Sequence, residues 1–244
     1  AEDFTLPFDV IDLTGLDERD QVVRIEAGVL EAGRYPFRLK EDLPIRITLL
    51  RTNEQAATLI LVIHHIACDA WSMGLLVNEL ASLYAAFLQR EQSPLPELSI
   101  QYSDFARWQR GQLQGEYLAD QLAYWKSQLQ DPPPPLSLPT DFPRPGVQTF
   151  RGARQPFALR CELSEALDRF CRTRQITMFS LLLALFGLLL HRYTGEEDIL
   201  IGTPVANRAR RQLEALIGFF VNTIVVRARL SATMRFDALL DQIQ

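Results

Sequence analysis

The side chains best suited to proton transfer lie together in the stretch IHHIACD, residues 63–69. An imidazole exchanges protons near neutral pH because its ordinary pKa is about 6.5. Asp69, four residues after His65, is spaced to orient such a ring or to pair with an arginine. A structural interpretation also stands, because adjacent histidines often end a strand and both Asp69 and Ser72 are ordinary N-cap residues. We expect no metal, since the spacing does not match a ligand set.

The flanking elements must position this cluster. Apolar runs at 45–51 and 58–65, separated by a polar turn at 53–55, predict a hairpin of two buried strands. Apolar residues at helical spacing predict a helix over 72–90. Because side chains alternate between the faces of a strand, only one of the two histidines can face a given cleft. We expect this to be His65, with His64 buried and hydrogen-bonded.

Proline placement predicts two lobes. Seven of the 14 prolines lie between residues 132 and 145, and a run of four cannot enter a helix or a central strand. We therefore predict a stiff linker at 131–146 between an N-terminal lobe at 1–130 and a C-terminal lobe at 147–244. In the second lobe we expect strands over 149–159, 198–203 and 221–226 and helices from 164 and over 179–193. Interleaved helices and strands in both halves favour an α/β or α+β fold.

Composition argues against several classes of protein. The net charge of −5 gives no basic surface for nucleic acid or an anionic membrane. Three cysteines without a CxxC pair predict a reducing compartment, the cytoplasm. The longest apolar run, 178–190, is too short to span a bilayer, and no export signal is visible at the N-terminus. We therefore expect a cytoplasmic protein with no nucleic-acid or membrane partner.

Four stretches in order resemble the condensation domains of non-ribosomal peptide synthetases, which are related to chloramphenicol acetyltransferase. HHIACDAWS (64–72) resembles the HHxxxD signature, and YSDFARW (102–108) looks like the YxDFAxW motif. IGFFVNT (217–223), ending near Arg227, is similar to IGxFVNT…R, and 191–208 is similar to the segment before it. The family's opening and closing motifs have no counterpart, so we expect a central fragment lacking both ends. The family's usual glycine after the aspartate is Ala70 here.

The resemblance implies a V of two acyltransferase-like lobes, both incomplete in this chain, with a tunnel between them. It implies peptide-bond formation between a donor thioester and an acceptor aminoacyl amine. Both substrates would be carried on phosphopantetheine arms of an upstream and a downstream carrier domain. The domain itself would bind no cofactor, and an adenylation domain would belong to the same synthetase. The isolated fragment is expected to be inactive.

The resemblance also implies roles for nine residues. The catalytic set is His65, His64 and Asp69, with His65 facing the cleft as a base or as a positioner of the amine. The supporting set is Arg208, Ser72 and Asn222. Arg208 is expected to pair with Asp69 and so to tie the lobes together. Asn222 has a polar role at the site or caps a strand edge. The set lining the cleft is Trp71, Tyr102 and Trp108, with core packing favoured for Trp108.

Two alternatives stay open at this point. An epimerisation-type domain shares the signature but abstracts a Cα proton, and the residues after Asp69 resemble the peptide-bond-forming kind instead. A non-catalytic or gating module that binds carriers would keep the fold without turnover. The intact histidines exclude the DxxxxD heterocyclisation variant.

Overall fold

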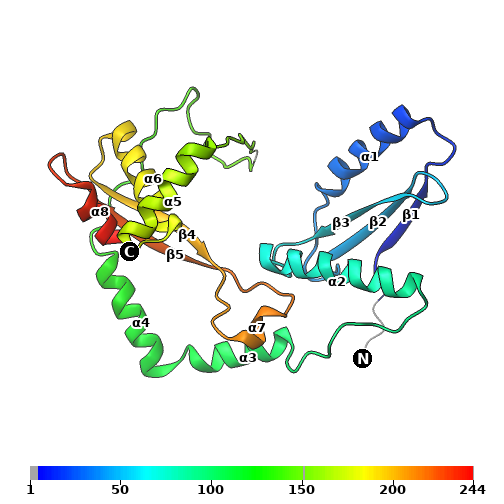
Figure 1. Cartoon of the computed structure of the whole chain (residues 1–244). Coiled ribbons are helices and arrows are strands. Elements are labelled where there is room, and N and C mark those ends of the chain that lie inside the picture. Colours follow the sequence, from blue (N-terminus) through cyan, green and yellow to red (C-terminus); the bar gives the residue numbers. More distant parts are fainter. Residues whose placement is uncertain (1–4, 151, 244) are drawn as a thin grey trace. The chain divides into compact units, whose positions relative to one another are not determined.

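The computed structural model describes residues 5–150 and 152–243 and contains two compact units (Figure 1). The first unit combines Ala1–Gly111 with Ala206–Val221, and the second combines Gln112–Val205 with Asn222–Gln244. These units differ from the lobes predicted at 1–130 and 147–244, because 112–130 groups with the second unit and 206–221 with the first. The lobes and their linker at 131–146 stay a prediction.

The first unit is built on a three-stranded sheet in the order β1-β2-β3. Strands β2 (Ile45–Arg51) and β3 (Ala57–Ile63) pair antiparallel, with Ile45 opposite Ile63. The predicted hairpin is therefore confirmed. Strand β1 (Phe8–Asp12) pairs parallel to β2 and is not predicted from the sequence, because its short alternating stretch becomes a strand only beside β2.

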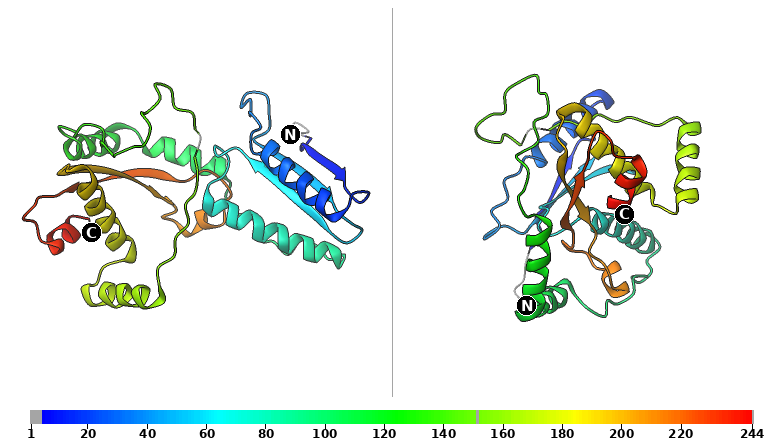
Figure 2. Two further views of the ribbon diagram at one scale, coloured as in Figure 1. Left: turned by 90° about the horizontal axis from the view of Figure 1, so that it is seen from above. Right: turned by 90° about the vertical axis from the view of Figure 1, so that its left-hand side faces the viewer.

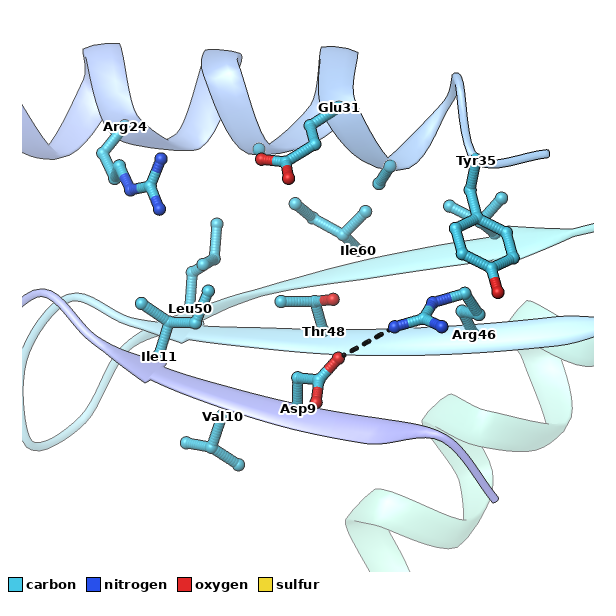
Figure 3. Close-up of a pocket in the computed structure, with 13 residues that line it drawn as sticks. Asp9, Val10, Ile11, Arg24, Glu31, Tyr35, Arg46, Thr48, Leu50 and Ile60 are labelled. Atoms are coloured by element: carbon cyan, nitrogen blue, oxygen red, sulfur yellow. Dashed lines mark hydrogen bonds and ion pairs between the residues drawn. The ribbon is translucent and has the colours of Figure 1, made fainter. Parts of the chain in front are cut away.

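Two helices flank this sheet on opposite faces (Figures 1 and 3). Helix α1 (Glu18–Ala32) begins at the N-cap Asp17 and packs on the face that carries Leu50 and Ile60. Helix α2 (Ala70–Leu88) begins directly after the histidine cluster, with Asp69 as its N-cap. The turn between β3 and α2 therefore holds the candidate catalytic residues at the end of the sheet.

A cavity of about 440 Å³ lies between α1 and the sheet (Figure 3). Arg46 of β2 reaches Asp9 of β1 at 3.3 Å and stacks 4.3 Å from the centre of the Tyr35 ring. The residues that line it come from α1, the turn after it and the three strands, and do not include 63–72. This cavity is therefore separate from the histidine cluster.

Helix α3 (Tyr102–Gln112) and the short helix α7 (Arg211–Glu214) complete the first unit. They share a second apolar cluster, whose buried members are Phe105, Leu213, Leu216 and Phe220. This cluster brings the segment 206–221 against α3, about a hundred residues earlier in the chain.

The second unit is built around an antiparallel ribbon of β4 (Asp198–Val205) and β5 (Asn222–Arg229). Helices α5 (Cys161–Arg174) and α6 (Met178–Thr194) lie on one side of the ribbon and α4 (Gly115–Gln128) on the other (Figure 2). Helix α8 (Phe236–Ile243) packs against α6 and β5. Helices and strands in both units confirm the mixed α/β class.

Arg227 of β5 joins α4 to the ribbon. Its guanidinium binds the Asp198 carboxylate at 2.6 Å and donates to the backbone oxygens of Gln128, Gln130 and Asp131 at 2.8 to 3.0 Å. These carbonyls belong to the last turn of α4 and the residues after it, which have no helical partners of their own. The arginine at the end of the IGxFVNT…R motif thus fixes the start of the proline-rich segment.

The strand expected over 149–159 is wrong. The described residues of that segment form no strand, and the Phe150 and Phe157 side chains are more than four-fifths exposed. A segment becomes a strand only where a neighbour supplies ladder hydrogen bonds, and in the described structure β4 and β5 pair only with each other.

Helix α2 is long and apolar enough, by length and composition, to cross a membrane. Its 19 residues reach a mean hydropathy of 1.2, and the bent pair α5–α6 passes the same test. Core helices of globular proteins pass it as well. Because the N-terminus of α2 is bound by a buried ion pair, described below, we assign α2 to the globular fold.

We expect Leu181→Ala to lower the free energy of unfolding of this chain by about 2–5 kcal/mol, because Leu181 is 2% exposed in the core between α6 and the ribbon. The matched control is Leu182→Ala, one residue further along α6 and 45% exposed, which should cost less than about 1 kcal/mol. Urea unfolding followed by circular dichroism measures both. Equal losses for the two variants would contradict this core.

Candidate functional site

The two histidines lie in a turn beyond the end of β3. The strand ends at Ile63, and the backbone carbonyl of His64 accepts from Ala67 N–H at 3.0 Å to close the turn. His64 N–H still donates to Pro44 O at 2.9 Å, so backbone pairing with the β2 side continues to His64, and His65 follows in the turn. The two rings have different neighbours, Phe37 for His64 and Phe219 for His65.

His65 is exposed, and a backbone carbonyl fixes its tautomer. Its Nδ1 lies 2.8 Å from the Cys68 carbonyl oxygen. Because a carbonyl oxygen can only accept, Nδ1 carries the hydrogen and donates it. In the neutral ring Nε2 then holds the free lone pair. The ring also packs edge-to-face against Phe219, with ring centres 5.3 Å apart and planes at 88°.

His64 takes the opposite tautomer. The backbone N–H of Ile66 donates to its Nδ1 at 3.1 Å, so the neutral ring carries its hydrogen on Nε2. The ring packs edge-to-face on Phe37 and is half-buried. The expectation of a hydrogen-bonded His64 is confirmed, but the expectation of a buried His64 is wrong, because the residue is only partly buried.

Asp69 is buried and receives hydrogen bonds from both sides. As the N-cap of α2 it accepts from Ser72 N–H at 2.8 Å. Its Oδ2 accepts from Phe220 N–H at 3.0 Å, and Arg208 Nη2 lies 3.2 Å from Oδ1. The structure thus brings together Asp69 and Arg208, the pair expected from the sequence. Both belong to the first compact unit.

Ser72 and Arg208 extend this network into the backbone of 213–218. Ser72 Oγ donates to Gly218 O at 2.8 Å and receives Gly218 N–H at 3.0 Å and Arg208 Nη2 at 2.7 Å. Arg208 Nη1 donates to the carbonyls of Leu213 and, at 2.8 Å, Leu216. The guanidinium stacks 4.0 Å from the centre of the Phe220 ring. The start of α2 is thereby bound to a segment far along the chain.

The network sets the charge of its members. Burial alone would raise the pKa of Asp69, but hydrogen bonds from the Ser72 and Phe220 N–H groups and the charge of Arg208 together lower it. Burial, and then the Asp69 charge, raise the pKa of Cys68 and of Tyr102. Asp69 is therefore an anion, whereas Cys68 and Tyr102 are held neutral beside it.

Gly218 and Phe219 belong to the site although neither is among the residues selected from the sequence. A Cβ on Gly218 would lie 2.2 Å from Cδ2 of Tyr102, whose hydroxyl donates to Phe219 O at 2.8 Å. The IGFFVNT motif is visible in the sequence. That its glycine makes room for the tyrosine of the YxDFAxW motif depends on two segments meeting in the fold.

The other predicted residues have different surroundings. The Trp71 indole is 48% exposed and donates to Glu214 O at 3.0 Å. Trp108, for which core packing is favoured by the sequence, is 42% exposed and stacks on Arg210 at 4.6 Å, so that expectation is wrong. Its helix turns Phe105 inward and leaves Trp108 at the surface. Asn222 is exposed at the start of β5 and its Oδ1 accepts from Thr223 N–H.

Ala70 stands where the family has glycine, and it is the exposed first residue of α2. Its backbone is helical, which alanine adopts without strain.

Within residues 5–150 and 152–243, no group of three or more His, Cys, Asp or Glu side chains is arranged to hold a metal ion.

Comparisons of this chain with family models, curated proteins and solved structures agree on one family. The condensation-domain family model matches residues 1–244. A linear gramicidin synthase protein of Brevibacillus parabrevis is 46% identical over 237 residues, which is 96% of this chain and 5% of that protein. The X-domain from teicoplanin biosynthesis, solved in complex with OxyB, matches with a TM-score of 0.84 at 27% identity. A four-domain nonribosomal peptide synthetase bound to AMP and glycine matches with a TM-score of 0.80 at 26% identity.

These matches cover different shares of the matched proteins. The X-domain match covers 98% of this chain and 52% of that one, and the four-domain match covers 98% and 18%. The chain thus spans about half of one relative and a twentieth of another. Fold and histidine turn together define a protein of the chloramphenicol-acetyltransferase-like class. Within that class, the chain belongs to the condensation-domain family.

We expect Gly218→Ala to destabilise the chain by about 1–3 kcal/mol, because the added methyl overlaps the Tyr102 ring. Gly74→Ala in α2 is the matched control: nothing lies within 4 Å of its Cβ, and alanine favours a helix. Combining Gly218→Ala with Tyr102→Ala should cost less than the sum of the single changes in urea unfolding. Strict additivity would contradict the proposed overlap.

Asp69→Asn keeps the helix cap but leaves Arg208 unpaired, so we expect a loss of about 3–5 kcal/mol at neutral pH. Since the folded state lowers the pKa of Asp69, its stabilisation is complete above about pH 4 and is lost as pH falls through the lower, folded value. Below about pH 4, the free energy of unfolding should therefore change less with pH in the variant than in the wild type. The control is Asp17→Asn, an exposed N-cap of α1, expected to change stability by less than about 0.5 kcal/mol. Equal effects at both caps would refute the role of the buried pair.

Proposed function

We propose that this domain forms a peptide bond between a donor acyl or peptidyl thioester and an acceptor aminoacyl amine. The observation that carries the proposal is the state of His65: Nδ1 is committed to the Cys68 carbonyl, which leaves Nε2 as an exposed acceptor. Membership of the condensation-domain family supplies the reaction class.

In this reaction the amine nitrogen attacks the thioester carbonyl carbon. A C–N bond forms and the C–S bond breaks, while the proton lost by the nitrogen passes to His65 Nε2 and then to the departing thiolate. A thioester is already activated and an amine is a strong nucleophile, so the step needs no covalent acyl-enzyme. General-base assistance of this kind contributes about 10²–10⁴-fold.

Positioning of the two reactants supplies the other part of the rate enhancement. Holding two reactants in register is worth up to about 7–11 kcal/mol in well-oriented systems. An acceptor nitrogen that hydrogen-bonds to Nε2 is oriented and deprotonated by the same contact. His65 thus serves as positioner of the amine and as proton acceptor.

Asp69 acts through the backbone. Its oxygens bind the N–H groups of Ser72 and Phe220 and the Arg208 guanidinium, so they hold the turn and the 218–220 segment around His65. We therefore propose that Asp69, Arg208 and Ser72 are positioning residues.

The substrates would arrive on phosphopantetheine arms of an upstream and a downstream carrier domain, and the domain itself would bind no cofactor. Similarity to the linear gramicidin synthase and to a four-domain nonribosomal peptide synthetase supports a multidomain synthetase. We propose that this synthetase also holds an adenylation domain and lies in the cytoplasm. The exposed apolar side chains of α2 fit a helix that packs against other protein in such an assembly.

A second candidate is a non-catalytic module that recruits or gates a protein partner. It is favoured by the similarity to the X-domain, which was solved in complex with another protein, OxyB. In that case the fold and the buried pair would be retained for binding, and His65 would have no role in turnover.

His65→Ala in the synthetase module that contains this chain should lower the condensation rate by about 10²–10⁴-fold, because the acceptor at Nε2 is lost. The matched control is His191→Ala, whose ring also has Nδ1 on a backbone carbonyl (Glu196, 2.7 Å) but lies in the second unit. Single-turnover formation of the amide on the acceptor carrier measures both. Turnover of His65→Ala at the wild-type rate would overturn the proposal and favour the recruiting module.

A further inference from the structure

The backbone at 218–220 is held at four of its polar groups by residues far away in the sequence. Gly218 N–H and O bind Ser72 Oγ, and Gly218 O also receives Asp69 N–H at 3.2 Å. Phe219 O receives the Tyr102 hydroxyl, and Phe220 N–H binds Asp69 Oδ2. A segment bound this way has little freedom to shift, so the direction of its side chains is set by the network.

The side chains of this segment point to different surroundings. Phe220 is 2% exposed, lies in the apolar cluster with Phe105 and stacks on Arg208. Phe219 is 36% exposed, is not among the buried members of that cluster, and packs edge-to-face on His65. The side chain of Phe219 is therefore turned toward the imidazole, while its neighbour builds the core.

The His65 ring is restrained from two directions. The Cys68 carbonyl, on the same turn, takes the Nδ1 hydrogen, and the Phe219 ring packs edge-to-face against the imidazole from the distant segment. One hydrogen bond alone holds an exposed ring weakly. Turning the ring over about its Cβ–Cγ bond breaks the bond from Nδ1 to the Cys68 carbonyl and puts Cδ2 and Cε1 in the places of Nδ1 and Nε2. An aromatic pair of this geometry is worth about 0.5–1.5 kcal/mol, enough to favour one rotamer.

We infer that Phe219 is a positioning residue that holds the His65 imidazole with Nε2 directed outward for the acceptor amine. The inference rests on the proposed function. The network binds the backbone oxygen of Phe219 and leaves its side chain outside the buried hydrogen bonds. The side chain at this position can therefore be changed without altering the buried network, and it tunes the restraint on the imidazole.

The experiment compares three variants of Phe219 in the synthetase module that contains this chain. Phe219→Ala removes the ring, Phe219→Leu keeps apolar volume without a ring, and Phe219→Tyr keeps the ring. We expect kcat for condensation to fall by between about 5- and 100-fold in Phe219→Ala and Phe219→Leu, with KM for the acceptor carrier unchanged. Phe219→Tyr should recover most of this loss.

Nitrogen-15 NMR of the His65 ring provides the readout that a merely structural role would not move. In the wild type and in Phe219→Tyr we expect a single tautomer with the hydrogen on Nδ1. In Phe219→Ala and Phe219→Leu we expect a mixture, while thermal melts stay close to wild type. Phe220→Leu is the contrasting core variant, because it should lower the melting temperature.

His65→Ala separates this inference from the proposed function. Wild-type turnover in His65→Ala would remove the proposed function and this inference with it. Loss of turnover in His65→Ala together with full turnover and an unchanged ring spectrum in Phe219→Leu would overturn the inference alone. A rise in KM with unchanged kcat and spectrum would also overturn it, because Phe219 would then bind substrate instead of positioning the ring.

Discussion

The buried ion pair between Asp69 and Arg208 is the interaction on which the candidate site depends. Both side chains are at least 96% buried, and two charges taken out of water are costly unless each finds hydrogen-bond partners. The partners are the helix cap of α2, the Ser72 hydroxyl, and backbone groups of 213, 216 and 220. The need to satisfy the pair therefore binds the start of α2 to a segment about 140 residues later in the chain.

This pair shapes the histidine turn without touching the reacting ring. The Asp69 oxygens are occupied by Ser72, Phe220 and Arg208, while backbone carbonyl and amide groups determine the tautomers of the two histidines. The arrangement differs from a catalytic triad, in which a carboxylate orients the imidazole directly. Here the carboxylate fixes the backbone, and the backbone fixes the ring.

One continuous motif serves both compact units. Gly218, Phe219 and Phe220 complete the surroundings of His65 in the first unit, and Arg227 holds the end of α4 to β4 and β5 in the second. The change of role falls at Val221–Asn222, where β5 begins. The IGxFVNT…R motif thus surrounds His65 in one unit and holds α4 in the other. Its residues therefore do not form a single active-site element.

Much of the fold and part of the site follow from the sequence, because they depend on local patterns. Apolar runs and a polar turn predict β2 and β3, helical spacing predicts α2 and α6, and HHxxxD with two further motifs identifies the family. The contact between Asp69 and Arg208 follows from the resemblance. The catalytic role predicted for His65, the supporting role of Asn222 and the cleft-lining role of Trp71 stay predictions.

Tertiary structure alone decided the rest. A strand needs a neighbour, so the described residues of 149–159 form no strand, whereas Phe8–Asp12 becomes β1 beside β2. The exposed place of Trp108, the half-burial of His64 and the fit of Tyr102 over Gly218 each depend on which distant surface arrives opposite them. Local sequence fixes which conformations a segment favours, but burial and hydrogen-bond partners come from residues far along the chain, and only the folded chain brings them together.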